Sequence, residues 1–378
     1  SGHTRSGGLG KRRASSTARA RIRPTPSSLG SRLGIRSFEF SLDRAVVPLR
    51  AMTARAAPML ENNVAGDAAW THDRITSRDW HVPLPTAAVD ELEVAVEQLR
   101  RAPAPTESLR VDAFALPTCA AVMRDVHARL VNGIGMAIVD RVPIERYTVD
   151  ESRAIAWLLA SLLGRVVAQK QHGVFLYDVR DTGKALEYGV RRSLTNLSQP
   201  FHTDGPWLAR TPAFVGLFCL QSAHDGGRSR YTSLLTAHNE LRRRHPDLLP
   251  RLYQPFRWDR QAEHGPDEAK FATHPVFTFD GRTLSARYYD DYIVNGYDLA
   301  GERLDEVGSD ALAAMRRIVN DPAHWTEFRI ESGEFQYLNN RLFAHCRTEF
   351  RDIPGAERQR HLIRVWNRDD GTPDLEGR

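Results

Sequence analysis

The chain contains no long hydrophobic run and no paired cysteines. No stretch of its 378 residues approaches the roughly 18 consecutive apolar residues that a membrane-spanning helix needs. Its three cysteines, Cys119, Cys219 and Cys346, are widely spaced and form no C-x-x-C motif, which argues for a reducing compartment. We therefore expect no membrane partner and a cytoplasmic location, or an organellar matrix if the N-terminal segment is a transit peptide.

Two common catalytic signatures are also missing. The sequence has no Gly-x-Ser-x-Gly elbow and no G-x-x-x-x-G-K-[ST] phosphate loop. These absences disfavour classical nucleophilic hydrolysis and P-loop nucleotide chemistry.

Excess positive charge is confined to the N-terminal segment. Residues 1–60 hold 12 Lys plus Arg against two acids, Glu39 and Asp43, whereas the remainder holds 40 basic and 45 acidic residues. Because the segment is rich in Ser and Gly with few aromatic residues, we expect residues 1–65 to be a disordered basic extension. It could be an extension upstream of a start at Met52 or Met59, a transit peptide or a nucleic-acid-binding tail. The body is mildly acidic, so we expect no nucleic-acid partner.

Residues 66–378 alternate helical and strand patterns with few long gaps. Apolar spacing predicts helices at 86–101, with Thr86 as a candidate cap, and at 117–131, 152–163, 236–244 and 309–319. Strands are expected at 136–139, 214–220, 335–343 and 361–366, with a hairpin turning at Asp280-Gly281. Many short strands with grouped helices predict a single α+β domain, a jelly-roll double sheet braced by N-terminal helices.

Two histidines and one aspartate form a candidate metal site. His202 and Asp204 are two residues apart, so on an extended strand their side chains share a face, and His345 follows the predicted strand 335–343. Two imidazoles and one carboxylate, with open positions left over, form the facial triad that holds non-haem Fe(II) in oxygenases. A lone His-x-Asp carries little weight, so the assignment depends on all three residues together.

The motifs around these residues resemble those of the taurine dioxygenase family, which includes the 2,4-dichlorophenoxyacetate dioxygenases. The similarity covers residues 110–370, in the family's order and at its approximate spacings. The motifs that carry it are Ser193-Leu194-Thr195-Asn196-Leu197, Phe201-His202-Thr203-Asp204-Gly205, Asp225-Gly226-Gly227-Arg228-Ser229, Leu338-Asn339-Asn340-Arg341, His345-Cys346-Arg347-Thr348 and Arg360-His361-Leu362-Ile363-Arg364.

The resemblance implies a double-stranded β-helix that uses Fe(II), 2-oxoglutarate and O2. His202, Asp204 and His345 would be the iron ligands. By motif position Arg360 would hold the far carboxylate of 2-oxoglutarate, because a guanidinium is a permanently charged fork, and Ser229 would add a hydrogen bond.

Further residues are candidates for substrate binding. Arg364 lies four residues beyond Arg360 and should face the barrel interior, where it would hold either an anionic substrate or an internal acid. Asn196, Tyr188 and Trp207 flank the iron motif as candidate pocket walls, although an aromatic-core role is equally compatible. The run Tyr288-Tyr289-Asp290-Asp291-Tyr292 is a candidate lid segment.

The implied reaction is oxidation of an unactivated C–H bond in a small, carboxylate-bearing metabolite, with release of succinate and CO2. Because Asp204 is retained, halogenation is disfavoured, whereas desaturation, cyclisation and epimerisation stay open with hydroxylation. The alternative is a cupin-like metal protein or isomerase that does not use 2-oxoglutarate, against which Arg360 and Ser229 argue. A homo-oligomer is possible.

Overall fold

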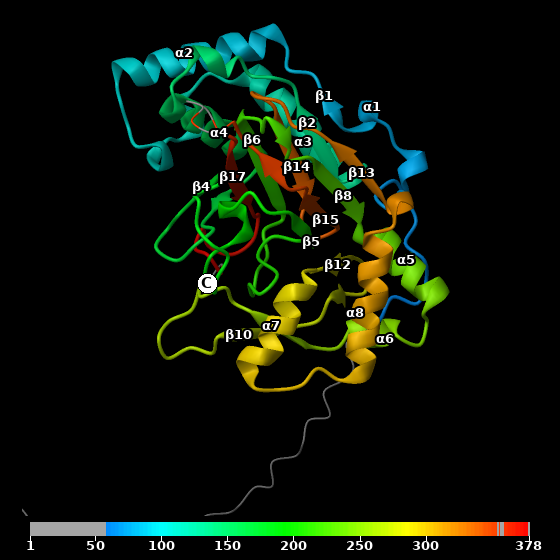
Figure 1. Cartoon of the computed structure of the whole chain (residues 1–378). Coiled ribbons are helices and arrows are strands. Elements are labelled where there is room, and N and C mark those ends of the chain that lie inside the picture. Colours follow the sequence, from blue (N-terminus) through cyan, green and yellow to red (C-terminus); the bar gives the residue numbers. More distant parts are fainter. Residues whose placement is uncertain (1–57, 354, 356–358, 377–378) are drawn as a thin grey trace, which may run out of the picture. The chain divides into compact units, whose positions relative to one another are not determined.

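The computed structural model in Figure 1 describes residues 58–353, 355 and 359–376. The chain divides into two units, Ser1–Ala54 and Arg55–Arg378. The first unit, and with it the predicted disorder as far as residue 57, lies outside the described residues.

The packed domain begins earlier than the boundary expected at residue 66. Met59 and Leu60 lie against the hydrophobic core, and the Val64 amide donates to Asn239 Oδ1 at 2.8 Å. Asn239 Nδ2 donates back to the Val64 carbonyl at 2.9 Å. Residues 59–64 are therefore part of the folded unit.

A seven-stranded sheet forms one layer of the domain (Figure 1). Its order is β1 (His81–Val82), β2 (Met136–Val139), β14 (Phe335–Asn339), β6 (Phe214–Gln221), β17 (His361–Asn367) and β3 (Val166–Val167), with β4 (Leu176–Val179) also on β17. All pairings are antiparallel except that of β1 with β2. The strand predicted at 214–220 is the central β6, whose first six residues are buried, as in a strand covered on both faces.

A four-stranded antiparallel sheet forms a second layer. Its order is β13 (Trp325–Phe328), β8 (Ser229–Ser233), β15 (Phe343–Arg347) and β5 (Gln199–His202). The single strand expected at 335–343 is wrong, because the chain leaves the first sheet at Asn339 and enters the second at Phe343. Asn340 fixes this turn, since its Nδ2 donates to the carbonyls of Asp204 and Pro212 at 3.0 and 3.2 Å.

Three N-terminal helices cover one face of the larger sheet, as Figure 1 shows. They are α2 (Thr86–Arg101), α3 (Pro117–Asn132) and α4 (Val149–Leu163), close to the predicted ranges. Ile155 and Leu158 of α4 share a buried cluster with Ile363 and Val365 of β17. The expected cap at Thr86 is wrong, because Pro85 is the N-cap and Thr86 already lies inside the helix. Pro85 has no side-chain donor or acceptor, so no side chain caps α2.

The remaining elements are distributed around the two sheets. The helices are α1 (Ser77–Trp80), α5 (Leu234–Arg244), α6 (Leu249–Leu252), α7 (Asp290–Ala300) and α8 (Glu306–Val319). Paired strands are β9 (Phe256–Asp259) with β10 (Phe271–His274), β11 (Phe277–Phe279) with β12 (Leu284–Ala286), and β7 (Asp225–Gly226) with β16 (Phe350–Arg351). Single turns of 3-10 helix are η1 (His72–Arg74), η2 (Thr106–Ser108), η3 (Val111–Ala113), η4 (Ile144–Arg146), η5 (Arg192–Leu194) and η6 (Pro322–His324).

The predicted hairpin is confirmed by the antiparallel pairing of β11 with β12. No helix within the described ranges combines the length and the apolar character needed to cross a bilayer. The domain is therefore a mixed helix and sheet structure, with two main sheets and helices grouped on the outside.

Candidate active site

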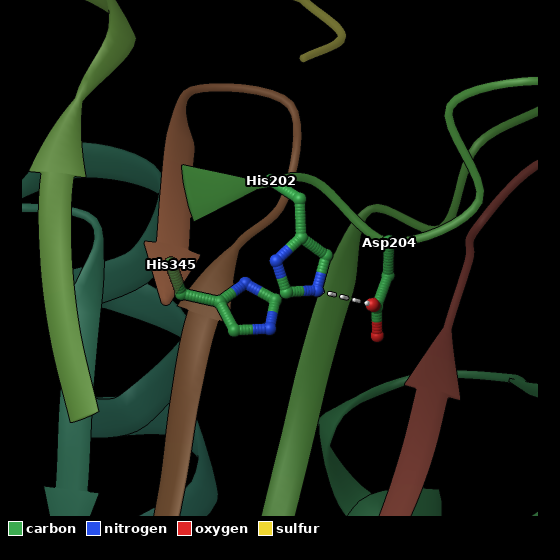
Figure 2. Close-up of side chains that lie close together, drawn as sticks. All are labelled: His202, Asp204 and His345. Atoms are coloured by element: carbon green, nitrogen blue, oxygen red, sulfur yellow. Dashed lines mark ion pairs between the residues drawn. The ribbon is translucent and has the colours of Figure 1, made fainter. Parts of the chain in front are cut away.

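The structure brings His202, Asp204 and His345 together in the interior. One possible ligand atom from each lies within 4.8 Å of the others, and all three residues are buried. Figure 2 shows the two imidazoles and the carboxylate directed toward one another. The predicted convergence of these three residues is thus present in the folded chain.

The two histidines are paired across neighbouring strands. His202 ends β5 and lies directly opposite His345 of β15, with ring centres 4.2 Å apart. His202 Nδ1 lies 2.9 Å from the Pro200 carbonyl, to which it can only donate. That bond leaves a lone pair on His202 Nε2, which accepts from Gln199 Nε2 at 2.9 Å and lies 3.4 Å from Asp204 Oδ1. One imidazole is therefore held in a tautomer suited to binding a metal.

Asp204 does not share a strand with His202 as expected. Strand β5 ends at His202, and Thr203 turns away to exchange backbone and hydroxyl hydrogen bonds with Tyr288. The Asp204 amide donates to Asn340 Oδ1 at 2.7 Å, so the bend that carries the carboxylate is fixed by the turn between the two sheets. The carboxylate reaches the site from a loop and not from the pleat of a strand.

Two side chains of β17 hold the Asp204 carboxylate. Trp366 Nε1 donates to Oδ2 at 2.8 Å, and Arg364 Nη1 lies 3.2 Å from the same oxygen. Burial alone would raise the pKa of Asp204, but the charge of the neighbouring Arg364 brings it well below its ordinary value. The carboxyl group is therefore ionised, as a metal ligand must be.

The donor set fits a ferrous ion. Burial and the neighbouring His202 lower the pKa of His345 to about 3, so its imidazole is neutral, and its Nδ1 is buried without a hydrogen-bond partner. An unpartnered buried nitrogen is costly unless something outside the protein chain satisfies it. Two neutral imidazoles and one carboxylate match the ligand set of non-haem Fe(II) sites with open positions.

Arg360, just before β17, is a second unsatisfied group. Its guanidinium is buried, its Nη1 has no partner, and burial lowers its pKa to about 10. Gly227 makes room for it, because a Cβ there would lie 3.1 Å from Arg360 Nε. Ser229, the predicted hydroxyl partner, is buried at the start of β8 two residues further on. The motif residues expected to hold a carboxylate thus lie in the interior.

Sequence reasoning missed Arg347 as a functional candidate. Its guanidinium carbon lies 4.9 Å from the centre of the Phe350 ring, as does that of Arg360. Burial, with the charge of Arg360, lowers the pKa of Arg347 to about 9. The signal was its position two residues beyond His345 on one strand, which gives both side chains the same face.

The four predicted substrate residues separate into two at the metal site, Arg364 and Trp207, and two further out. Trp207 is buried and lines the small cavity beside His202, with its Nε1 unpartnered. Tyr188 is 53% exposed and contacts His264 Nε2 through its hydroxyl at 3.3 Å. Asn196 is half-buried, and its carbonyl accepts from the Phe350 amide at 3.1 Å. Neither Tyr188 nor Asn196 is among the residues that line the cavity at the metal site.

Aromatic side chains lie between the metal site and a larger hollow. Tyr289 lies 5.1 Å from the His202 ring and stacks on Tyr292 at 3.9 Å. Tyr292 lines both the metal-site cavity of about 20 Å³ and the hollow of about 420 Å³ that includes Tyr188. The tyrosine-rich run expected to form a lid therefore contributes an inner wall, and Tyr292 divides the two spaces.

Comparisons with known proteins agree with this site. Residues 96–366 match the model of the family described as taurine catabolism dioxygenase TauD, TfdA family. The FR-33289 synthase of Streptomyces rubellomurinus is 27% identical over 314 residues, covering 82% of this chain and 91% of that protein. A uridine-5'-phosphate dioxygenase of Amycolatopsis is 28% identical over 149 residues, 39% of this chain and 53% of that protein.

Solved structures show the same fold. The structure of asparagine oxygenase with Fe(II), hydroxyasparagine and succinate has a TM-score of 0.63 at 19% identity, covering 78% of this chain and 94% of that one. The non-haem iron oxygenase OrfP with Fe and alpha-ketoglutaric acid has a TM-score of 0.56 at 15% identity, covering 77% and 94%. Since the family model spans most of the chain, this protein belongs to the TauD, TfdA family and is a non-haem dioxygenase that uses Fe(II), 2-oxoglutarate and O2.

Proposed function

We propose that this dioxygenase hydroxylates an unactivated C–H bond of a small, acid-bearing metabolite, on a double-stranded β-helix formed by the two main sheets. The observation that carries the substrate class is Arg364, whose Nη2 is buried beside the metal site without a partner. Its other nitrogens are engaged, Nε with Gln169 Oε1 at 2.7 Å and Nη1 with Asp204. Arg364 therefore pairs with Asp204 through Nη1 and still has a charged donor, Nη2, available to bind an anion.

The remaining site residues follow from the donor set. His202, Asp204 and His345 hold the iron, while Arg360 and Ser229 hold the far carboxylate of 2-oxoglutarate. When bound, iron and 2-oxoglutarate would activate O2, so that one oxygen atom enters the substrate as hydroxyl and the other enters succinate as CO2 is released. Trp366 and Arg364 keep the Asp204 carboxylate ionised and oriented, which keeps it available as a ligand.

Substrate contacts are assigned to the walls of the two neighbouring spaces that share Tyr292. Trp207 lies at the metal-site cavity and Tyr188 at the outer hollow, so the substrate extends from one toward the other past Tyr292. Asn196 belongs to the 195–197 segment whose carbonyls accept from Arg347, and it acts by shaping the co-substrate end. Relatives named for uridine-5'-phosphate and asparagine support a polar, acid-bearing substrate.

The test is anaerobic incubation of the full chain with Fe(II), 2-oxoglutarate and a panel of small acids. We expect a metal-to-ligand charge-transfer band with 2-oxoglutarate, and a shift in that band when an acid occupies the site. Under air, the same acid should yield hydroxylated product and succinate in equal amounts. If acids and neutral analogues of equal size give identical shifts and yields, the acid-bearing class is wrong.

A further inference from the structure

The three strands around the metal site align their inward side chains in two layers. In the first layer, His345 of β15 lies opposite His202 of β5 on one side and Tyr231 of β8 on the other. Two residues along β15, Arg347 lies opposite Ser229 of β8 and, after a register shift in the pairing with β5, opposite Gln199. Because residues two apart on a strand share a face, Arg347 belongs to the same interior as His345.

The distance between the layers suits the co-substrate. Two residues of antiparallel strand span about 7 Å, which is comparable to the length of an extended five-carbon dicarboxylate. A molecule that chelates a metal in the His345 layer therefore brings its far carboxylate toward the Arg347 layer. Ser229, already assigned to that carboxylate, lies in this second layer.

Arg347 has donors left over at that level. Its Nη2 donates to the Thr195 carbonyl at 2.9 Å and also to the Leu197 carbonyl, but its Nε and Nη1 are buried without partners. Arg360 Nη1 is likewise buried and unpartnered. Both guanidinium groups contact the Phe350 ring, so two sets of free charged donors lie around one aromatic side chain.

Two buried cations with free donors require an anion. Within the described ranges, neither guanidinium forms an ion pair, and Asp352 accepts from the Arg360 main-chain amide only. A carboxylate has about four lone-pair positions and can accept from two guanidinium groups and a hydroxyl at once.

We propose that Arg347 binds the distal carboxylate of 2-oxoglutarate together with Arg360 and Ser229. The inference rests on the proposed function, since it concerns the same co-substrate. Arg347 would then make two kinds of contact. Its Nη2 donates to carbonyls of the 195–197 segment beside β5, and its remaining donors bind the anion. The competing explanation is that Arg347 only fastens this segment.

The experiment compares 2-oxoglutarate with 2-oxopentanoate, which has the same chelating end and lacks the distal carboxylate. Both are titrated anaerobically into the Fe(II)-loaded full chain, with the charge-transfer band as the readout of binding. For wild type we expect a strong preference for 2-oxoglutarate. In Arg347→Met this preference should fall about 10- to 100-fold, because hydrogen bonds to a charged group are lost, while 2-oxopentanoate binding changes by less than about threefold.

A loss of affinity shared equally by both oxoacids, or an unchanged preference, would overturn the proposal. Arg347→Lys keeps the charge and a large side chain, so it remains informative if Arg347→Met does not fold, and it should still lose at least about tenfold of the preference. Arg230→Met is the matched control, because Arg230 lies on the neighbouring strand and pairs outward with Glu327 at 2.7 Å. If wild type itself gives no band with 2-oxoglutarate, the proposed function fails; if the band forms and only the preference test fails, Arg347 alone is wrongly assigned.

Discussion

His202 and His345 are 143 positions apart in the sequence yet are direct cross-strand partners of β5 and β15. Their ring centres lie 4.2 Å apart. The fold therefore pairs two hydrophilic side chains at a buried position where apolar cross-strand contacts would otherwise stabilise the sheet. Burying both rings costs the free energy of their hydration. A metal bound by both nitrogens would compensate for that cost.

Metal binding should consequently stabilise the domain. Fe(II) at about 100 times its dissociation constant is expected to raise the free energy of unfolding by about 2.7 kcal/mol, because the ligands converge only in the folded state. His345→Ala should abolish this gain. His361→Gln is the control, since His361 pairs with Asp178 outside the triad. The measurement is anaerobic thermal unfolding with and without Fe(II), and an equal gain in His345→Ala would contradict the assignment.

Trp366→Phe should weaken metal binding more than it weakens the fold. The change removes the hydrogen bond from Nε1 to Asp204 Oδ2 and leaves an aromatic ring in place. Loss of such a partner to a metal ligand costs about 10- to 100-fold in affinity. Trp258→Phe is matched to it, because Trp258 is also fully buried and donates its one hydrogen bond to the His274 carbonyl at 2.8 Å. Comparable Fe(II) affinities for both variants would argue against this role of Trp366.

Gly227→Ala should impair the co-substrate site. Gly227 has φ of +65°, and a Cβ would lie 3.1 Å from Arg360 Nε and 3.3 Å from Phe350 Cβ. We expect affinity for 2-oxoglutarate to fall about tenfold, or about 1.4 kcal/mol, as the guanidinium shifts.

Gly301→Ala separates backbone strain from this contact. Gly301 has a similar φ of +67° at the end of α7, with no atom within 4 Å of the added Cβ. Both variants should lose about 1–2 kcal/mol of stability from the left-handed conformation. Only Gly227→Ala should weaken 2-oxoglutarate binding, as measured by the charge-transfer titration.

Stability should fall on acidification below about pH 6.5. Burial lowers the pKa of His238 to about 4, and also that of His274. Between the folded and unfolded pKa values the unfolded chain binds more protons, so the free energy of unfolding rises with pH and is lost as pH falls. Each histidine should cost about 2 kcal/mol between pH 7 and pH 5.

Urea unfolding of the His238→Gln variant at both pH values checks this expectation. The variant should lose about 2 kcal/mol less than wild type over the same interval. His81→Gln is the control, because the His81 side chain is half-exposed beside Asp140. A pH dependence of His238→Gln identical to that of wild type would exclude His238 as a source of the acid sensitivity.

The sequence predicted the helices and the residue types of the metal ligands better than it predicted the strand boundaries and the contacts around the site. The ranges of α2 and α3 followed from apolar spacing, which local sequence determines directly. The break between β14 and β15 was missed because residues on both sides of it are buried and apolar. Asn340 makes the turn through hydrogen bonds to residues more than 100 positions away, which no local pattern reveals.

The site could be predicted only as far as residue type and motif spacing extend. His202, Asp204 and His345 carry distinctive chemistry, so the sequence pointed to them. Gln199 and Arg347 lie at the site because β5 pairs with β15. Trp366 lies there because it faces Asp204 from β17. Those relationships depend on register between strands that are distant in sequence.

The alternation along β17 constrains how this enzyme can diversify. Arg364 and Trp366 face the Asp204 carboxylate, while Ile363 and Val365 pack against the helices. Deleting one residue within β17 would turn each following side chain to the opposite face of the sheet. Asp204 would lose its hydrogen-bond partners, and a guanidinium would be buried in the core that faces the helices. New substrate preferences should therefore arise through insertions and substitutions in the segments around Tyr188 and Tyr292. Single-residue insertions or deletions within β17 should be selected against.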